Sequence, residues 1–269
     1  MALTRRKIFN WIKFLIIIYS GIGIALYYLQ DKILFHPDKS YADYSVRLKT
    51  PFKEFSIPIN KKDTVNVINF LPVNNIVNGT VVYFQDSKGS IETIEKKTAI
   101  FTKHGFSVWM FEYPGFGKSR GELTEAKLYE YAFQLKRLAE SNHSNNNMII
   151  YGEGFGAAIA ANLSSDSSVK HLILVSPFAS TADYFNCFLP IYPWKSMAHF
   201  KMSTMEYLLD VKTPVTIFLV KDNKKIKSTI KSTDQYLRIN SENEKEIYKT
   251  EAYQNSVAEI LKAVTIPLK

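Results

Sequence analysis

The stretch Met148-Ile-Ile-Tyr-Gly-Glu-Gly-Phe-Gly-Ala-Ala-Ile-Ala160 decides the fold. Its first four residues form a short apolar run of β type, and Gly152-Glu-Gly154 follows as a turn framed by glycines. Small residues from Ala157 onward are typical of a helix that packs closely on a neighbour. A strand, a tight turn and a helix in this order predict a βα unit with the turn at the carboxyl end of the strand.

Similar units lie on both sides of this stretch. Apolar strand-like runs occur at 80–84, 107–111, 171–175 and 214–220, and helical patterns occur at 91–104, 122–141, 155–164, 228–239 and 254–264. Such alternation predicts an α/β fold, a mostly parallel twisted sheet with helices on both faces, because parallel strands need crossover connections. The runs 53–59 and 64–70 are expected to form an antiparallel pair that leads into the sheet.

Composition excludes several classes of protein. The 269 residues are 46% hydrophobic and 22% charged, which argues against wholesale disorder. A single cysteine, Cys187, excludes a disulfide framework, a thiolate metal cluster and a CxxC redox pair. Four basic residues lie before residue 30, in a stretch without acidic residues: Arg5, Arg6, Lys7 and Lys13. Removing these four from the net charge of +9 leaves +5, with no dense basic face, so no nucleic-acid partner is predicted.

The N-terminal segment has the features of a membrane anchor. Trp11–Leu29 contains nineteen residues with one charge, and at 1.5 Å per residue it covers about 28 Å of a hydrocarbon core that is ~30 Å thick. We expect a signal-anchor over 1–29, with a cytoplasmic N-terminus, and a folded domain over 30–269 on the other side, periplasmic in a bacterium. Two alternatives stay open: a signal peptide cleaved near Gly23-Ile-Ala25, and a buried core helix.

Four segments in order carry a resemblance to a known family. They are Tyr83-Phe-Gln-Asp-Ser-Lys-Gly89, at the place of an H-G-x-x-G loop; Phe111-Glu-Tyr-Pro-Gly-Phe-Gly-Lys-Ser-Arg-Gly121, similar to D-Y-R-G-x-G-x-S-x-G; Gly152–Gly156, similar to the G-x-S-x-G elbow; and Ser176-Pro-Phe-Ala-Ser180, similar to P-F-x-S. The chain thus resembles the α/β-hydrolase superfamily over nearly its whole length. With the apolar segment running into Gln30–Pro37, it resembles the membrane-anchored esterase or peptidase-like branch. The resemblance implies the α/β-hydrolase fold.

The positions that carry catalysis in that family are altered here. The nucleophile position is Gly154, which has no side chain. The family's histidine follows the last strand, and the resemblance places that position near Tyr253 or Gln254, whereas no histidine follows His199 in this sequence. The acid position falls at Asp222 or Asn223.

The loop that would stabilise an oxyanion is altered too. The resemblance places Gln85-Asp86 where the family has His-Gly, and a carboxylate there opposes a developing negative charge. We expect Gln85, Asp86, Glu153 and Phe155 to be candidates for lining a pocket, with Glu153 read as a surface or rim carboxylate. Gly154 is expected at a sharp turn with positive φ.

The resulting expectation is a membrane-anchored pseudohydrolase that binds a protein, peptide or lipid-like ligand, without metal or cofactor. The alternative is an active hydrolase with a rearranged site. A third class, an oxidoreductase, rests on the G-x-G-x-x-A pattern ending at Ala157, but the next strand ends without the acidic residue that would hold a ribose. The aromatic residues from Phe178 to Trp194 are expected to form either a lid or part of the core.

Overall fold

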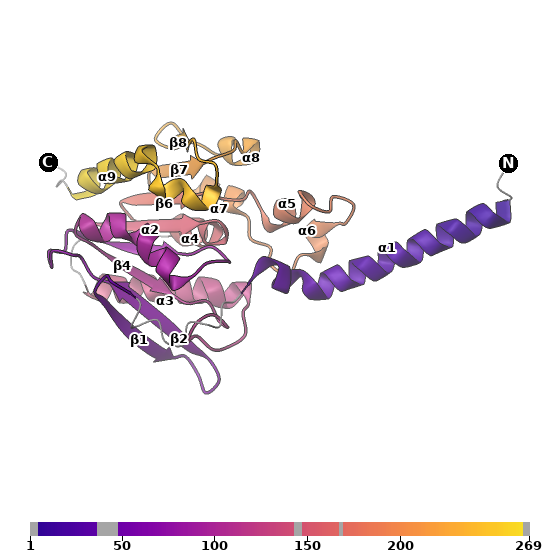
Figure 1. Cartoon of the computed structure of the whole chain (residues 1–269), viewed down its shortest axis with the longest axis horizontal. Coiled ribbons are helices and arrows are strands. Elements are labelled where there is room, and N and C mark those ends of the chain that lie inside the picture. Colours follow the sequence, from indigo (N-terminus) through magenta and orange to yellow (C-terminus); the bar gives the residue numbers. More distant parts are fainter. Residues whose placement is uncertain (1–4, 37–47, 143–146, 167–168, 266–269) are drawn as a thin grey trace.

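The computed structural model describes residues 5–36, 48–142, 147–166 and 169–265. In this part of the chain, strands form one sheet in the order β1-β2-β4-β3-β5-β6-β7-β8 (Figure 1). The strands are β1 (Phe52–Pro58), β2 (Thr64–Phe70), β3 (Gly79–Phe84), β4 (Phe106–Phe111), β5 (Met148–Glu153), β6 (His171–Val175), β7 (Val215–Leu219) and β8 (Gln235–Arg238). Only β1 with β2 and β2 with β4 pair antiparallel among these strands. The expected leading pair and mostly parallel sheet are confirmed.

Helices cover both faces of the sheet. The longer ones in the body are α2 (Ile91–Lys103), α3 (Glu125–Asn142), α4 (Phe155–Ser165) and α9 (Glu251–Thr265). Shorter ones are α5 (Thr181–Asn186), α6 (Trp194–Met197), α7 (Thr204–Asp210), α8 (Lys224–Lys227) and the 3-10 helix Glu244–Lys249. Alternate side chains of β3 enter different cores: Val82 and Phe84 pack on the side of α3 and α4, and Val81 and Tyr83 pack on the side of α2 and α9.

The helix expected over 228–239 is wrong. The structure has one helical turn at Lys224–Lys227, a turn region, and then strand β8 (Gln235–Arg238), which pairs parallel with β7. Tyr236 and Leu237 point to opposite cores, so the true period of this segment is two. The short strand extends the sheet beyond β7, which is buried along its whole length. The loop after the last strand therefore begins at Ile239.

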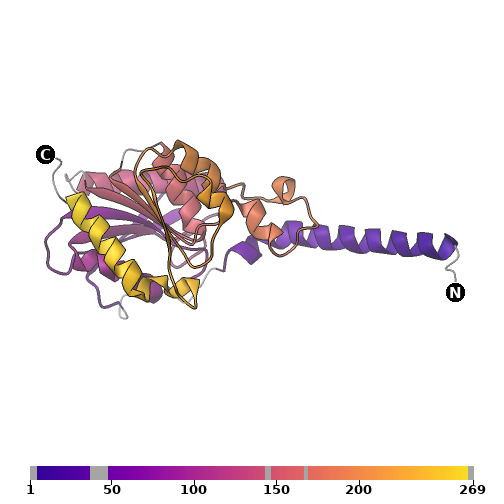
Figure 2. The same ribbon diagram turned by 90° about the horizontal axis from the view of Figure 1, so that it is seen from above.

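Helix α1 (Arg5–Leu34) projects from the body, and its contacts with the body begin at Tyr19, midway along the helix (Figures 1 and 2). Lys7–Leu34 is apolar and long enough to cross a membrane, with a mean hydropathy of 1.9, and its apolar window is not buried in the protein. This exposure excludes the buried core helix among the alternatives; a membrane anchor and a signal sequence both fit. The helix continues past Leu29, and Gln30 and Leu34 are buried against the body.

Candidate functional site

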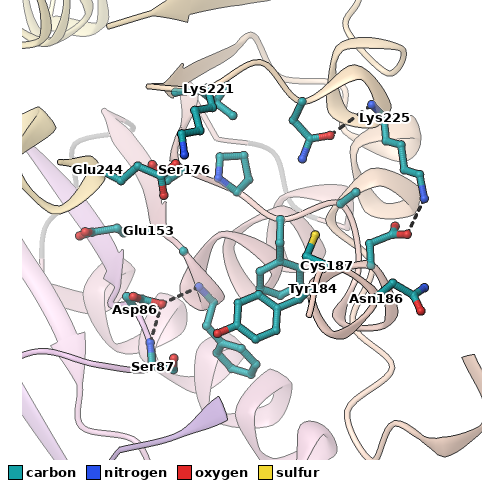
Figure 3. Close-up of a pocket in the computed structure, with 18 of the residues that line it drawn as sticks. Asp86, Ser87, Glu153, Ser176, Tyr184, Asn186, Cys187, Lys221, Lys225 and Glu244 are labelled. Atoms are coloured by element: carbon teal, nitrogen blue, oxygen red, sulfur yellow. Dashed lines mark hydrogen bonds and ion pairs between the residues drawn. The ribbon is translucent and has the colours of Figure 1, made fainter. Parts of the chain in front are cut away.

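A cavity of about 820 Å³ opens at the carboxyl ends of β3, β5, β6 and β7 (Figure 3). The loops that follow these strands line it together with the segment that carries α5. It brings together six of the residues singled out in the sequence, namely Asp86, Glu153, Gly154, Phe155, Asp222 and Asn223. Gln85 lies outside it: its side chain borders a separate small space near Ile91, and its carbonyl accepts a hydrogen bond from the Tyr113 hydroxyl.

Gly154 forms the apex of the turn between β5 and α4. Its φ of 53° and ψ of −114° lie in a region that side chains disfavour, and its N–H donates to the Val175 carbonyl at 2.9 Å. A Cβ atom built on Gly154 would lie 2.3 Å from Oδ1 of Asp86. Positive φ at this turn agrees with the sequence expectation, and the clash shows that the Asp86 carboxylate uses the space that a side chain would need.

The Asp86 carboxylate binds two backbone amides at the elbow. Its Oδ1 accepts hydrogen bonds from the N–H of Ser87 at 2.8 Å and from the N–H of Phe155 at 3.0 Å (Figure 3). One amide belongs to the loop after β3 and the other to the residue after the elbow apex. In the α/β-hydrolase fold the oxyanion hole is formed by the N–H of the residue after the elbow apex and by an N–H of the loop after β3. The Asp86 carboxylate therefore engages one amide from each of these two regions.

Glu153 lines the cavity but is buried, so its interpretation as a solvated surface carboxylate is wrong. The side chain forms an ion pair with Lys97 of α2 and accepts a hydrogen bond from the Tyr83 hydroxyl at 3.1 Å. Burial raises the pKa of the Glu153 carboxyl, and the Lys97 ammonium partly offsets this. The sequence did not indicate this ion pair, because Lys97 lies on α2, 56 residues before Glu153. Glu153 is thus held toward α2 at the edge of the cavity.

Tyr253 and Gln254 do not reach the cavity. Tyr253 is fully buried in α9, where its hydroxyl lies 3.1 Å from the Tyr151 hydroxyl. The Gln254 amide donates to the Tyr248 carbonyl at 2.6 Å. Glu244, in the segment after β8, lines the cavity instead. Because β8 runs parallel to β7, the loop after β8 leaves the sheet at the same edge as the cavity, and Glu244 lies in that loop.

Asp222 and Asn223 both line the cavity but differ in role. The Asn223 side chain caps α8, accepting hydrogen bonds from the N–H groups of Lys225 and Ile226 at 3.2 Å each. Its own N–H donates to the Tyr236 hydroxyl at 2.9 Å. Asp222 is exposed at the cavity wall. Asp222 is therefore the carboxylate that this loop offers to the cavity.

The aromatic residues between β6 and β7 divide between core and surface. Phe185, Tyr192 and Trp194 are buried, whereas Phe178 and Tyr184 line the cavity and Phe188 is 68% exposed. We call residues 181–200, which include α5 and α6, the cap. Within the described residues, no group of three or more His, Cys, Asp or Glu side chains is arranged to hold a metal ion.

Glu112, in the loop after β4, is a buried carboxyl that borders the same small space as Gln85. Its Oε2 accepts hydrogen bonds from the Lys118 N–H at 2.7 Å and from the Asn66 amide at 3.0 Å. Burial raises the pKa of Glu112 to about 7, despite these bonds. The folded chain thus holds this proton more tightly than the unfolded chain does.

The contribution of Glu112 to the free energy of unfolding should therefore fall as pH rises from about 4.5 to about 7, where Glu112 ionises in the folded state. Glu112→Gln removes this loss. The free energy of unfolding of the variant, minus that of the unmodified chain, should therefore increase by up to about 3 kcal/mol as pH rises across that range. Burial lowers the pKa of His171 to about 4, which has the opposite effect but cancels in the difference. Denaturant titrations of both proteins between pH 4 and 8 measure it; a difference independent of pH contradicts the assignment.

Comparison with known proteins gives a consistent picture. The model of the serine aminopeptidase S33 family matches residues 77–266. The uncharacterized protein YfhR of Escherichia coli (strain K12) is 21% identical over 190 residues, which are 66% of this chain and 62% of that protein. Protein bem46 of Schizosaccharomyces pombe is 26% identical over 197 residues, 65% of this chain and 64% of that protein. The chain thus spans less than two thirds of the length of these relatives.

Solved structures share the fold. An esterase of Pyrococcus furiosus superposes with a TM-score of 0.69 at 15% identity, covering 87% of this chain and 98% of its own. An alpha-beta hydrolase from Vibrio vulnificus superposes with a TM-score of 0.67 at 15% identity, covering 97% of this chain and 95% of its own. At this identity the likeness establishes the arrangement of strands and helices, and the residues of the cavity decide the chemistry.

Proposed function

Because the chain belongs to the serine aminopeptidase S33 family of α/β hydrolases, we propose that it is a membrane-anchored member that no longer hydrolyses and keeps its cavity for binding. One observation carries this proposal: the Asp86 carboxylate holds both amide donors of the oxyanion site. A negative charge there repels the oxyanion that acyl transfer develops. The hydrolytic transition state would have no place to form.

The magnitudes favour loss of activity over a slow enzyme. Removing one oxyanion donor from a serine protease costs roughly 100- to 1,000-fold in kcat. Losing the nucleophile or the histidine costs roughly a million-fold. Here the apex is Gly154, none of the described residues that line the cavity is a histidine, and Asp86 engages both donors. These deficits fall on three separate parts of the mechanism, so no single compensation restores it.

The cavity itself supports a binding role. Its volume of about 820 Å³ lies within the range of roughly 300–1,000 Å³ typical of small-ligand sites. Phe155, Phe178 and Tyr184 give it apolar surface, and Lys221 and Lys224 also line it. Apolar surface together with cations fits a lipid-like molecule with an acidic head, or a peptide segment with an acidic group.

The membrane part of the proposal rests on α1. The apolar window within Lys7–Leu34 is not buried in the body, and the basic residues before it favour a cytoplasmic N-terminus. We therefore place residues 1–29 in the membrane as a signal-anchor, and the domain over 30–269 on the non-cytoplasmic side.

A fluorophosphonate probe tests the proposal on the detergent-solubilised full chain. Such probes form a covalent adduct with an activated serine, so intact-mass measurement should show no adduct. The matched positive control is a family member with serine at the elbow, treated in parallel. A stoichiometric adduct on the unmodified chain would overturn the proposal.

Hydrolysis through a rearranged site is the second candidate, and Ser176 is the observation that favours it. This residue lines the cavity with a φ of 48°, and its buried hydroxyl has no hydrogen-bond partner in the described structure. Figure 3 shows Ser176, Lys221 and Glu244 on the same side of the cavity. An adduct that Ser176→Ala abolishes would establish this second function.

A further inference from the structure

Helix α1 is fastened to the tip of the cap within its own apolar run. The Tyr19 hydroxyl donates to the Ile191 carbonyl at 3.0 Å, and the Tyr192 hydroxyl donates to the Tyr19 carbonyl at 3.0 Å. The two tyrosine rings stack with centroids 4.7 Å apart. Gly23 leaves room for the ring, since a Cβ there would lie 3.0 Å from it. The cap therefore lies alongside α1 (Figures 1 and 2).

A second set of contacts fastens α1 closer to the body. The Gln30 amide donates to the Met197 carbonyl at 3.0 Å, and its Oε1 accepts from the His199 N–H at 2.8 Å. The His199 ring nitrogen lies 3.1 Å from the Asp31 carboxylate. Tyr19 and Gln30 are separated by about 16 Å along the helix axis. Two fixed points at this distance set the direction of the cap relative to α1.

The depth of the cap follows from the length of the apolar run. If the membrane surface lay at the level of Tyr19, only residues 11–19 of the apolar run would be inside the membrane, and they span about 14 Å of helix. Crossing ~30 Å of hydrocarbon requires the rest of the run as well. Ile22, Ile24 and Tyr28 in that remainder are exposed, at 47%, 61% and 72%. The loop beside Tyr19 then lies at hydrocarbon depth.

The chemistry of that loop suits an apolar surrounding. No charged residue occurs between Asp183 and Lys195. At the tip, Phe188 is 68% exposed and Ile191 is 64% exposed. Two prolines there, at 190 and 193, lack an N–H that would need a partner. The Leu189 carbonyl accepts from the Trp194 indole at 2.8 Å and the Ile191 carbonyl accepts from the Tyr19 hydroxyl at 3.0 Å, so these two carbonyls have partners inside the protein, as non-helical backbone in a membrane requires.

We propose that residues 188–193, the cap loop, insert into the leaflet on the body's side of the membrane, with phospholipid acyl chains as the partner of Phe188 and Ile191. This rests on the membrane anchor of the proposed function. A shallow hollow between α1 and the cap, lined by Lys32, Lys88 and Tyr184 among others, then lies at the headgroups. Lys88 and Tyr184 also line the main cavity, so its mouth opens at the membrane surface.

Site-directed spin labelling of the full chain in phosphatidylcholine vesicles tests this insertion. In a Cys187→Ser background, single variants Ile191→Cys, Ile24→Cys and Ile76→Cys carry the label. All three isoleucines are exposed, at 64%, 61% and 59%. Ile76 precedes β3, at the opposite end of the strands from the cavity, and serves as the matched aqueous control. The measurement compares collisions with oxygen, which concentrates in hydrocarbon, against a water-soluble nickel chelate.

The three labels separate the outcomes. We expect labels at 191 and 24 to be several-fold more accessible to oxygen than to the nickel chelate, and the label at 76 to show the reverse. If the label at 191 is more accessible to the nickel chelate and the label at 24 is more accessible to oxygen, insertion of the cap loop is overturned while the anchor stands. An aqueous label at 24 overturns the anchor and the insertion together.

Discussion

Gly154→Ser yields a less stable protein that still does not hydrolyse esters. The serine Cβ would lie 2.3 Å from the Asp86 carboxylate, and the serine backbone would have to adopt a φ of 53°. Backbone strain costs about 1–3 kcal/mol, and displacing the carboxylate from two amides costs more, so we expect a loss of about 3–5 kcal/mol. Denaturant unfolding of the solubilised chain measures the loss, and p-nitrophenyl acetate hydrolysis should stay at background because no base activates the serine.

Gly115→Ser is the matched control for that variant. Gly115 also has a positive φ, of 84°, but nothing lies within 4 Å of its Cβ position. Gly115→Ser should lower the free energy of unfolding only by the cost of backbone strain, about 1–2 kcal/mol. Adding Asp86→Gly to Gly154→Ser should recover part of the larger loss, since the two residues share one space. Equal losses for the two serine variants would show that Asp86 does not fill the elbow.

Turnover should appear when three positions are changed together. Gly154→Ser supplies a nucleophile, Asp86→Gly frees the two amides, and Glu244→His places a base on the loop after β8, with Asp222 as the carboxylate. A positioned general base contributes roughly 100- to 10,000-fold. We therefore expect p-nitrophenyl acetate hydrolysis at least about 100-fold above the unmodified chain.

The choice of Glu244 over Tyr253 is itself part of this prediction. Tyr253 is fully buried in α9 and bonded to Tyr151, so Tyr253→His should destabilise the fold without reaching the cavity. The variant with Tyr253→His in place of Glu244→His should therefore show no turnover. Activity of that variant together with inactivity of the Glu244→His variant would mean that the loop after β8 does not carry the base position.

Local pattern was sufficient for most of the fold. Strand and helix periods predicted β3 to β7 and the helices α2, α3 and α4, whereas the short helices α5, α6 and α7 between β6 and β7 were not predicted. The glycine turn located the elbow at Gly154. The edge strand β8 was not predicted, because it has only four residues, two of them exposed, and so short a segment shows no clear alternation of apolar and polar residues. That error moved the expected histidine position to Tyr253, inside the core.

The main feature of the site is a contact that no local pattern reveals. Asp86 and Phe155 are 69 residues apart, and the bond between them depends on how the turn after β3 meets α4. The sequence indicated that a carboxylate at this loop opposes an oxyanion. The structure adds that the carboxylate accepts hydrogen bonds from the Ser87 and Phe155 amides, on the two loops where the proposed function places the oxyanion site. The burial of Glu153 likewise depends on Lys97 from another helix.

The oxyanion site gives the most direct test of the central claim. The rate of p-nitrophenyl acetate hydrolysis is compared between Gly154→Ser with Glu244→His and the same chain with Asp86→Gly added. If the Asp86 carboxylate occupies the oxyanion site, freeing both amides should raise kcat at least about 100-fold, since one such donor alone contributes that much. Equal rates with and without Asp86, in folded proteins, would contradict the account.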